Sequence, residues 1–152
     1  MKLTKLRLTK DVSNRLRFLA GRTGITPNLL CRLGFCLSLS EPVMPRPEDF
    51  PEEDREFNRY TLLGEYDALF IALLRERCKN DGLDENALPG AFRAHMNRGV
   101  LLLQQRVRGL QDLATLASSR PSSMVEKDSA NARDTRHGVP GRPNTQPSPM
   151  SK

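Results

Sequence analysis

The stretch GRTGITP at residues 21–27 joins two segments with helical patterns, and it constrains the fold more than any other part of the chain. Glycine adopts the left-handed conformation that closes a helix at little cost, so Gly21 and Gly24 are expected to end the first segment. Thr26 suits the N-cap of the second segment, and Pro27 suits its first helical position. The stretch therefore predicts a helix, a tight turn and a second helix.

Each helical segment has an apolar face. The face of the first consists of Val12, Leu16, Leu19 and Ala20. Either Thr9 or Asp11 can cap its start. The second helix is expected over residues 27–39, with an apolar stripe of Leu29, Leu30, Leu33, Cys36 and Leu37. Gly34 in this helix allows the close approach of another backbone.

A short strand is predicted ahead of the first helix. Leu6 and Leu8 alternate with Lys5, Arg7 and Thr9, the period-two pattern of a strand with one buried face. A strand this short needs a partner. The rest of the chain offers few strand patterns, so pairing with a second copy or folding back as an extended arm are the expected solutions.

The remaining sequence predicts two further long helices. Four prolines in residues 40–54 indicate an extended connector, and residues 57–64 are ambiguous between a strand and an irregular lead-in. The third helix, ended by Gly82, has an apolar face of Tyr66, Leu69, Phe70, Leu73, Leu74 and Cys78. The fourth begins near Pro89, with a possible break at Gly99, and continues to about Leu116. The predicted fold is mainly α: a short basic strand or arm, a helix–turn–helix-like pair and two long helices.

The C-terminal stretch differs from the rest of the chain in composition. Residues 117–152 are rich in Ser, Pro, Asn, Asp and Arg and show no apolar periodicity, so we expect a folded domain over 1–116 and a disordered tail. No apolar run approaches the eighteen or so residues that a membrane-spanning helix needs, and a cytoplasmic protein is expected.

Basic side chains are concentrated near the N-terminus. The first forty residues contain eight Lys or Arg and one acid, whereas residues 41–80 contain six basic and ten acidic side chains. Such a basic end favours binding to a polyanion, or to a neighbouring copy whose charges complement it. The predicted DNA-contacting residues are Lys2, Lys5, Arg7, Lys10, Arg15, Arg17, Arg22 and Arg32. The next candidates are Arg93, Arg98, Arg106 and Arg108.

The sequence predicts no catalytic residues, no metal site and no cofactor. His95, with Arg93 and Asn97 nearby on one helix, is expected to be structural rather than a general base. The three cysteines lack metal-ligand spacing and are expected to be buried thiols, so an exposed, reactive one among Cys31, Cys36 and Cys78 is the remaining route to an enzyme. The acidic residues lack calcium-loop spacing and favour a solvated surface; they are Glu48, Asp49, Glu52, Glu53, Asp54 and Glu56.

Three separated segments carry a resemblance to a known family. They are LRLTKDVSNRLRFLAGRTGITPNLLCRLGFCLSL, DALFIALLRERCKNDGLD and AFRAHMNRGV, in that order and with Gly21, Gly24, Asn97, Arg98 and Gly99 in place. Over about residues 3–116 the chain resembles DndE, the small subunit of bacterial DNA phosphorothioation systems, which replace a non-bridging phosphate oxygen with sulfur. The tail after residue 116 is outside the family pattern.

The resemblance implies a non-catalytic, DNA-engaging subunit. Its partners would be a cysteine desulfurase, an iron–sulfur protein and an ATPase-like subunit, and its DNA would be duplex, including nicked duplex. The resemblance also implies a homo-oligomer, for which we expect a tetramer, and Gly21, Gly24 and Gly34 are the predicted oligomer contacts. Two other functions stay open on the residues alone: a ribbon–helix–helix transcription regulator selective for one operator, and a scaffold that binds only proteins.

Overall fold

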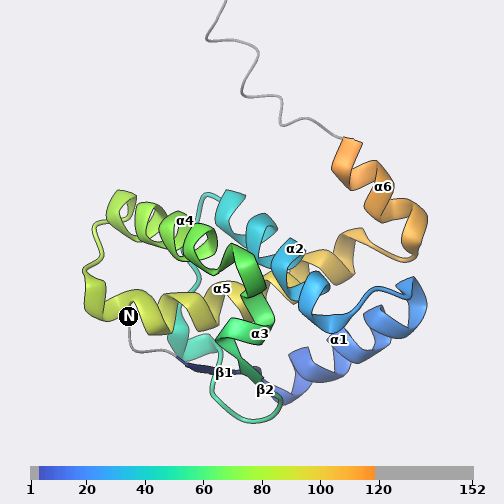
Figure 1. Ribbon diagram of the computed structural model, residues 1–152, viewed down its shortest axis with the longest axis horizontal. Coiled ribbons are helices and arrows are strands. Elements are labelled where there is room, and N and C mark those ends of the chain that lie inside the picture. Colours follow the sequence, from blue (N-terminus) through green and yellow to red (C-terminus); the bar gives the residue numbers. More distant parts are fainter. Residues whose placement is uncertain (1–3, 119–152) are drawn as a thin grey trace, which may run out of the picture. The chain divides into compact units, whose positions relative to one another are not determined.

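The structure is a computed structural model that describes residues 4–118, and these residues are mainly helical, as predicted (Figure 1). The strands are β1 (Lys5–Arg7) and β2 (Glu56–Asn58). The helices are α1 (Lys10–Thr23), α2 (Pro27–Ser40), α3 (Arg59–Leu63), α4 (Asp67–Asn80), α5 (Leu88–Arg106) and α6 (Leu110–Ser118). Three short 3-10 turns are η1 (Pro47–Asp49), η2 (Gly64–Tyr66) and η3 (Glu85–Ala87). Of the predicted tail, residues 119–152 lie outside the described part.

The two strands pair within the chain. β1 runs antiparallel to β2, with Leu6 opposite Phe57, and both of these side chains are buried. The predicted strand is therefore confirmed. Its partner overlaps residues 57–64, which the sequence left ambiguous, and belongs to the same chain. That stretch changes from strand to helix at Asn58, whose side chain accepts hydrogen bonds from the backbone N–H groups of Tyr60 and Thr61.

The first helix is capped at both ends by residues that the sequence offered as caps. At its start the Thr9 hydroxyl accepts a hydrogen bond from the Val12 N–H, 3.2 Å away. At its end Gly24 has φ +72° and donates its N–H to the Ala20 carbonyl. Gly21 lies inside α1, so the expectation that it helps to end the helix was wrong.

The second helix turns a different face to the core than the predicted stripe. Its buried residues are Leu30, Cys31, Gly34, Phe35 and Ser38. Leu29 and Leu33, predicted as core, are 45% and 43% exposed. The phase of α2 is set by its crossing with α5, because a Cβ at Gly34 would lie only 2.6 Å from the carbonyl carbon of Gly99. The same contact explains why α5 runs unbroken through Gly99, where a break was expected.

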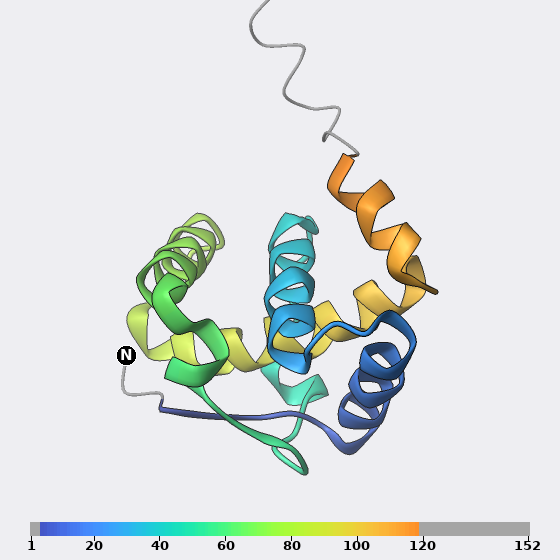
Figure 2. The same cartoon turned by 45° about the vertical axis from the view of Figure 1, so that its right-hand side comes forward.

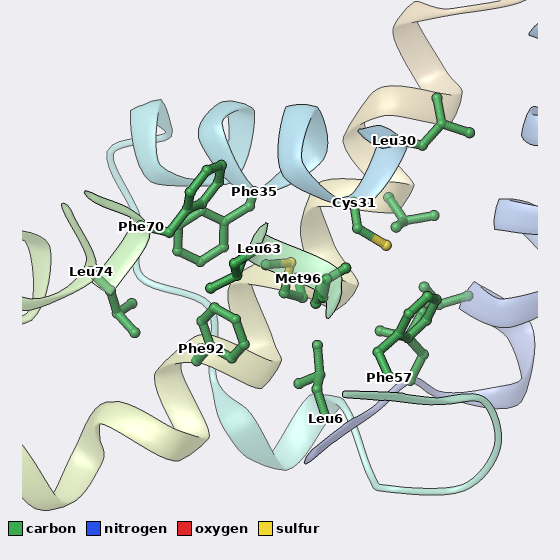
Figure 3. Close-up of a cluster of buried hydrophobic side chains, with 14 of the residues drawn as sticks. Leu6, Leu30, Cys31, Phe35, Phe57, Leu63, Phe70, Leu74, Phe92 and Met96 are labelled. Carbon is green, nitrogen blue, oxygen red and sulfur yellow. The ribbon is translucent and has the colours of Figure 1, made fainter. Parts of the chain in front are cut away.

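The core lies between α5 and the elements on either side of it. In Figures 1 and 2, α2 and α4 lie on one side of α5 and the two strands lie on the other. Figure 3 shows Phe35 of α2 among the rings of Phe70 and Phe92, with centroid separations of 5.6 and 5.5 Å. Met96 of α5 lies beside Leu63 in the middle of the same view, and Leu6 of β1 lies below it. Among residues 4–118, no helix combines the length and the apolar composition that a membrane span requires.

Candidate nucleic-acid interface

The strand β1 presents two of the predicted DNA-contacting residues. Lys5 and Arg7 are exposed, and both reach one carboxylate, that of Glu56 on β2, at 2.9 and 3.2 Å. Hydrogen bonds from Lys5, and to a smaller extent from Arg7, lower the pKa of Glu56. Exposed ion pairs of this kind contribute little to stability. The two cations therefore share one acid of β2, which lies far from them in the sequence. Lys2 lies outside the described residues.

Two other predicted DNA contacts are tied into the fold. The Arg15 guanidinium bonds to Asp11 on its own helix and to the Gln104 side chain of α5, at 2.6 and 2.7 Å. Arg32 donates from Nε to the Leu62 carbonyl at 2.6 Å. These bonds hold α1 against α5 and α2 against α3, so both arginines have a structural use.

The outer face of α1 carries the cations that the fold leaves available. Lys10, Arg17 and Arg22 are exposed. Arg17 has one weak hydrogen bond, 3.5 Å long, to Asn14, and Lys10 and Arg22 make no hydrogen bond or ion pair with any described residue. Arg22 is near enough to Asp112 to add slightly to the lowering of that pKa, which comes mainly from the backbone N–H groups of Arg108 and Gly109. We call Lys10, Arg17 and Arg22 the outer cations of α1.

Three of the four alternative cations lie on α5 and are occupied, whereas Arg108 lies between α5 and α6. The Arg98 guanidinium donates to the hydroxyl and the carbonyl of Ser38 at 2.8 and 2.5 Å, and also to the Val43 carbonyl. Arg93 pairs with Glu52 at 2.5 Å and Arg106 with Glu41 at 2.7 Å.

Arg77 of α4, which sequence reasoning missed, binds the carbonyls of Leu39, Glu41 and Pro42. Together Arg77 and Arg98 satisfy the carbonyls at and beyond the end of α2, a helix without a basic residue in its last turn.

His95 is a buried structural residue. Its side chain is fully shielded from solvent, Nδ1 lies 2.9 Å from the Ser38 hydroxyl and Nε2 lies 3.2 Å from the Met44 sulfur. Burial, and then the positive charge of Arg98, lowers the pKa of His95 to about 3. The ring is therefore neutral at physiological pH and reaches no open site.

Among the residues that the structure describes, the cysteines and acids form no metal-binding group. Cys31 and Cys78 are buried, and burial raises the pKa of Cys31 to about 12. Cys36 is exposed, contrary to expectation, but desolvation raises the pKa of its thiol as well, which disfavours the nucleophilic thiolate. Among residues 4–118, no three His, Cys, Asp or Glu side chains are placed to hold a metal ion.

The three glycines predicted as oligomer contacts occupy different environments. Gly34 is buried against Gly99, so the predicted close approach of another backbone is real but occurs inside the chain. Gly24 is needed at the turn because of its positive φ. Gly21, on the outer face of α1, and Gly24 both have open space where a Cβ would lie, so both leave room for a contact with another molecule.

These features describe a small helical protein with a basic surface helix and a strand pair formed within the chain. His95 and two of the three cysteines are buried in its core. Comparison with models of known protein families identifies the family of this chain. The family model described as "DNA sulphur modification protein DndE" matches residues 5–109. The chain belongs to the DndE family, and with it to DNA phosphorothioation systems, whose other Dnd subunits are its implied partners.

Two solved structures are similar to this chain. DndE from Escherichia coli B7A, described as involved in DNA phosphorothioation modification, is 29% identical, with a TM-score of 0.56, over 68% of this chain and 99% of that one. A DndE G21/24K mutant is 24% identical, with a TM-score of 0.53, over 68% of this chain and 98% of that one, and supports the fold alone. No curated protein matches the chain.

Proposed function

We propose that this chain is the DNA-engaging accessory subunit of its phosphorothioation system and that it performs no chemistry itself. The observation that carries the proposal is the outer face of α1, where three exposed cations form no ion pair with any described residue, in a fold that pairs most of its other arginines. A phosphate backbone offers such cations their strongest partner, and each contact releases counterions from the DNA. Contacts of this kind fix the protein on duplex or nicked DNA without reading bases.

The strand β1 extends this surface. Lys5 and Arg7 lie one short segment before α1, and DNA phosphates can compete for them with the Glu56 carboxylate because that ion pair is exposed. β1 pairs with β2 of its own chain, whereas the transcription-regulator alternative depends on a ribbon made by two copies, so this pairing weighs against that alternative. Sequence-indifferent attachment is therefore the better supported mode of DNA binding.

We further propose that several copies act together and multiply this basic surface. α2 contains one charged residue, Arg32, and exposes Leu29 and Leu33, while α4 exposes Leu69 and Leu73 on the same side of α5 (Figure 2). Exposed leucines gathered on one side of a small protein favour contact with another copy. Gly21 is a second predicted contact. Light scattering gives the number of copies, for which we expect four, and Leu33→Lys should reduce it.

The DNA proposal is tested by binding to labelled intact duplex across a salt series. Removing the three outer cations of α1, as Lys10→Ala, Arg17→Ala and Arg22→Ala together, should reduce the slope of log affinity against log salt by about 2 to 3, roughly 0.9 per lost phosphate contact. The matched control removes three exposed cations elsewhere, as Arg46→Ala, Arg75→Ala and Lys79→Ala, and should leave the slope unchanged.

Equal slopes for the two triple variants would move the DNA face away from α1. Binding that selects one palindrome by a thousandfold or more, roughly the ratio expected of sequence-specific regulators, would instead support a transcription regulator. Absence of binding at low salt would leave only a protein scaffold.

A further inference from the structure

A groove of about 510 Å³ lies between α2 and α6, two helices whose positions Figure 2 shows. Its walls include Leu33, Cys36 and Leu37 of α2 and Leu110, Leu113 and Ala114 of α6. None of the described residues that line it carries a charge. The occupant must therefore be apolar, because a phosphate or a charged side chain would lose its water there without gaining a partner.

The helix α6 is anchored at its start and apolar along the groove. The Asp112 carboxylate accepts hydrogen bonds from the backbone N–H groups of Arg108 and Gly109, at 2.7 and 2.9 Å, and these bonds lower the pKa of Asp112. The one charged side chain of α6 is therefore satisfied within its own chain. Leu113 packs against the core, whereas Leu110 is 58% exposed. α6 thus forms a wall of the groove and also offers an apolar side chain to another molecule.

Three observations favour a second copy of this chain as the occupant. The family match ends at residue 109, directly before α6, so a partner that serves the whole family cannot depend on this groove. The groove is self-complementary, because α6 supplies both a wall and the exposed Leu110, and two such uncharged surfaces do not repel each other. Leu33 lines the groove and also belongs to the exposed leucines through which we propose that copies meet.

Resting on the proposed assembly of several copies, we infer that the groove between α2 and α6 joins two copies, with Leu110 of each copy entering the groove of the other. Such a contact is isologous, since the same surface is used twice about a twofold axis. It removes Leu110 and the walls of the groove from water, which is the source of its stability. The part of the chain beyond the family match thus adds a contact between copies to those expected of α2 and α4.

Cys36 makes this contact measurable by cross-linking. It is exposed in the groove, whereas Cys31 and Cys78 are buried. The two Cys36 thiols approach each other across the twofold axis, so a short bifunctional maleimide should join full-length chains into covalent dimers, and Cys36→Ser should abolish them. Leu110→Glu should reduce the yield of dimers by about tenfold or more, because a carboxylate loses its water in an uncharged groove. Glutamate suits the first turn of a helix, so this variant should fold normally.

Two further variants separate this contact from other effects of an added charge. Val43→Glu places the same charge at an apolar position that is 72% exposed and outside the groove, and it should keep the full yield of dimers. Ala114→Glu, a second substitution on α6 within the groove, should reduce the yield as Leu110→Glu does. In light scattering Leu110→Glu should about halve the mass of the assembly, because an isologous contact joins copies in pairs.

The same measurements distinguish failure of this inference from failure of the proposed assembly. Leu69→Lys, on α4 and outside the groove, should lower the mass of the assembly and keep the cross-link through Cys36. An assembled wild type without Cys36 cross-links, or equal yields for Leu110→Glu and Val43→Glu, would overturn the contact through α6 and leave the proposed assembly standing. A wild type with the mass of one chain would overturn both.

Discussion

The crossing of α2 and α5 makes a sharp prediction about a single added methyl group. In Gly34→Ala, the new Cβ would lie 2.6 Å from the carbonyl carbon of Gly99 and 2.7 Å from its oxygen. Carbon atoms pack best at about 3.5 to 4.0 Å, so the helices must move apart by about 1 Å. The obstacle is backbone and has no rotamer through which it can yield. Separation would also weaken the contacts of Phe35 with Phe92, which lie beside this crossing.

The free-energy cost follows from two opposing effects. Overpacking costs about 3 kcal/mol at the upper end of its usual range, and replacing glycine by alanine in a helix returns about 1 kcal/mol. The free energy of unfolding should therefore fall by about 2 kcal/mol, and the urea midpoint by about 1 M. Gly21→Ala is the matched control, because the same methyl group meets open space there and should raise stability by up to about 1 kcal/mol.

Urea unfolding followed by far-UV circular dichroism, at one protein concentration, measures both variants. Midpoints that shift in opposite directions support the close crossing of α2 and α5. If Gly34→Ala is as stable as the wild type, or if both variants shift alike, the close approach of the two backbones is not what places α2 on α5.

Two further predictions concern buried polar groups. Arg98→Met should lower the free energy of unfolding by about 2 to 3 kcal/mol, because carbonyls near the end of α2 lose a charged donor. The variant should leave the slope of log DNA affinity against log salt unchanged. A slope reduced by about 1 would instead make Arg98 a phosphate contact. His95, whose folded pKa is about 3, should be protonated only in the unfolded chain between that value and its ordinary pKa near 6.5. Its contribution to stability is complete above pH 6.5 and is lost as pH falls through this window, by up to about 1.4 kcal/mol per unit. In urea titrations at pH 6.5 and pH 5, His95→Gln should lose less stability than the wild type, and equal losses would contradict the assignment.

Local signals in the sequence were sufficient for most elements of the fold. The cap residues Thr9, Gly24 and Pro27 placed the first two helices to within a few residues, because capping depends on immediate neighbours. Features that depend on contacts between residues far apart in the sequence could not be predicted from it. Periodicity could not fix the buried face of α2, a helix with apolar residues on most of its sides, and the Gly34–Gly99 contact that fixes it joins two helices far apart in sequence.

The candidate site shows the same division between local and distant information. The sequence identified the basic N-terminal region, yet eight cations there looked equivalent. Their availability depends on partners elsewhere in the chain, such as Gln104 for Arg15 and the Leu62 carbonyl for Arg32. Only the structure separates the outer cations of α1 from arginines that hold helices together.

The pairing of β1 with β2 has a consequence for how this protein folds. A strand at residues 5–7 is completed by one at residues 56–58, so the basic segment reaches its native state only after the whole connector has been brought back to it. Closing so long a loop costs entropy that is recovered only when Leu6 and Phe57 are buried together. The helix α1, which we propose to face DNA, is therefore not an independent module. A fragment that contains only β1, α1 and α2 would lack β2, the strand that holds β1 in place at the start of α1.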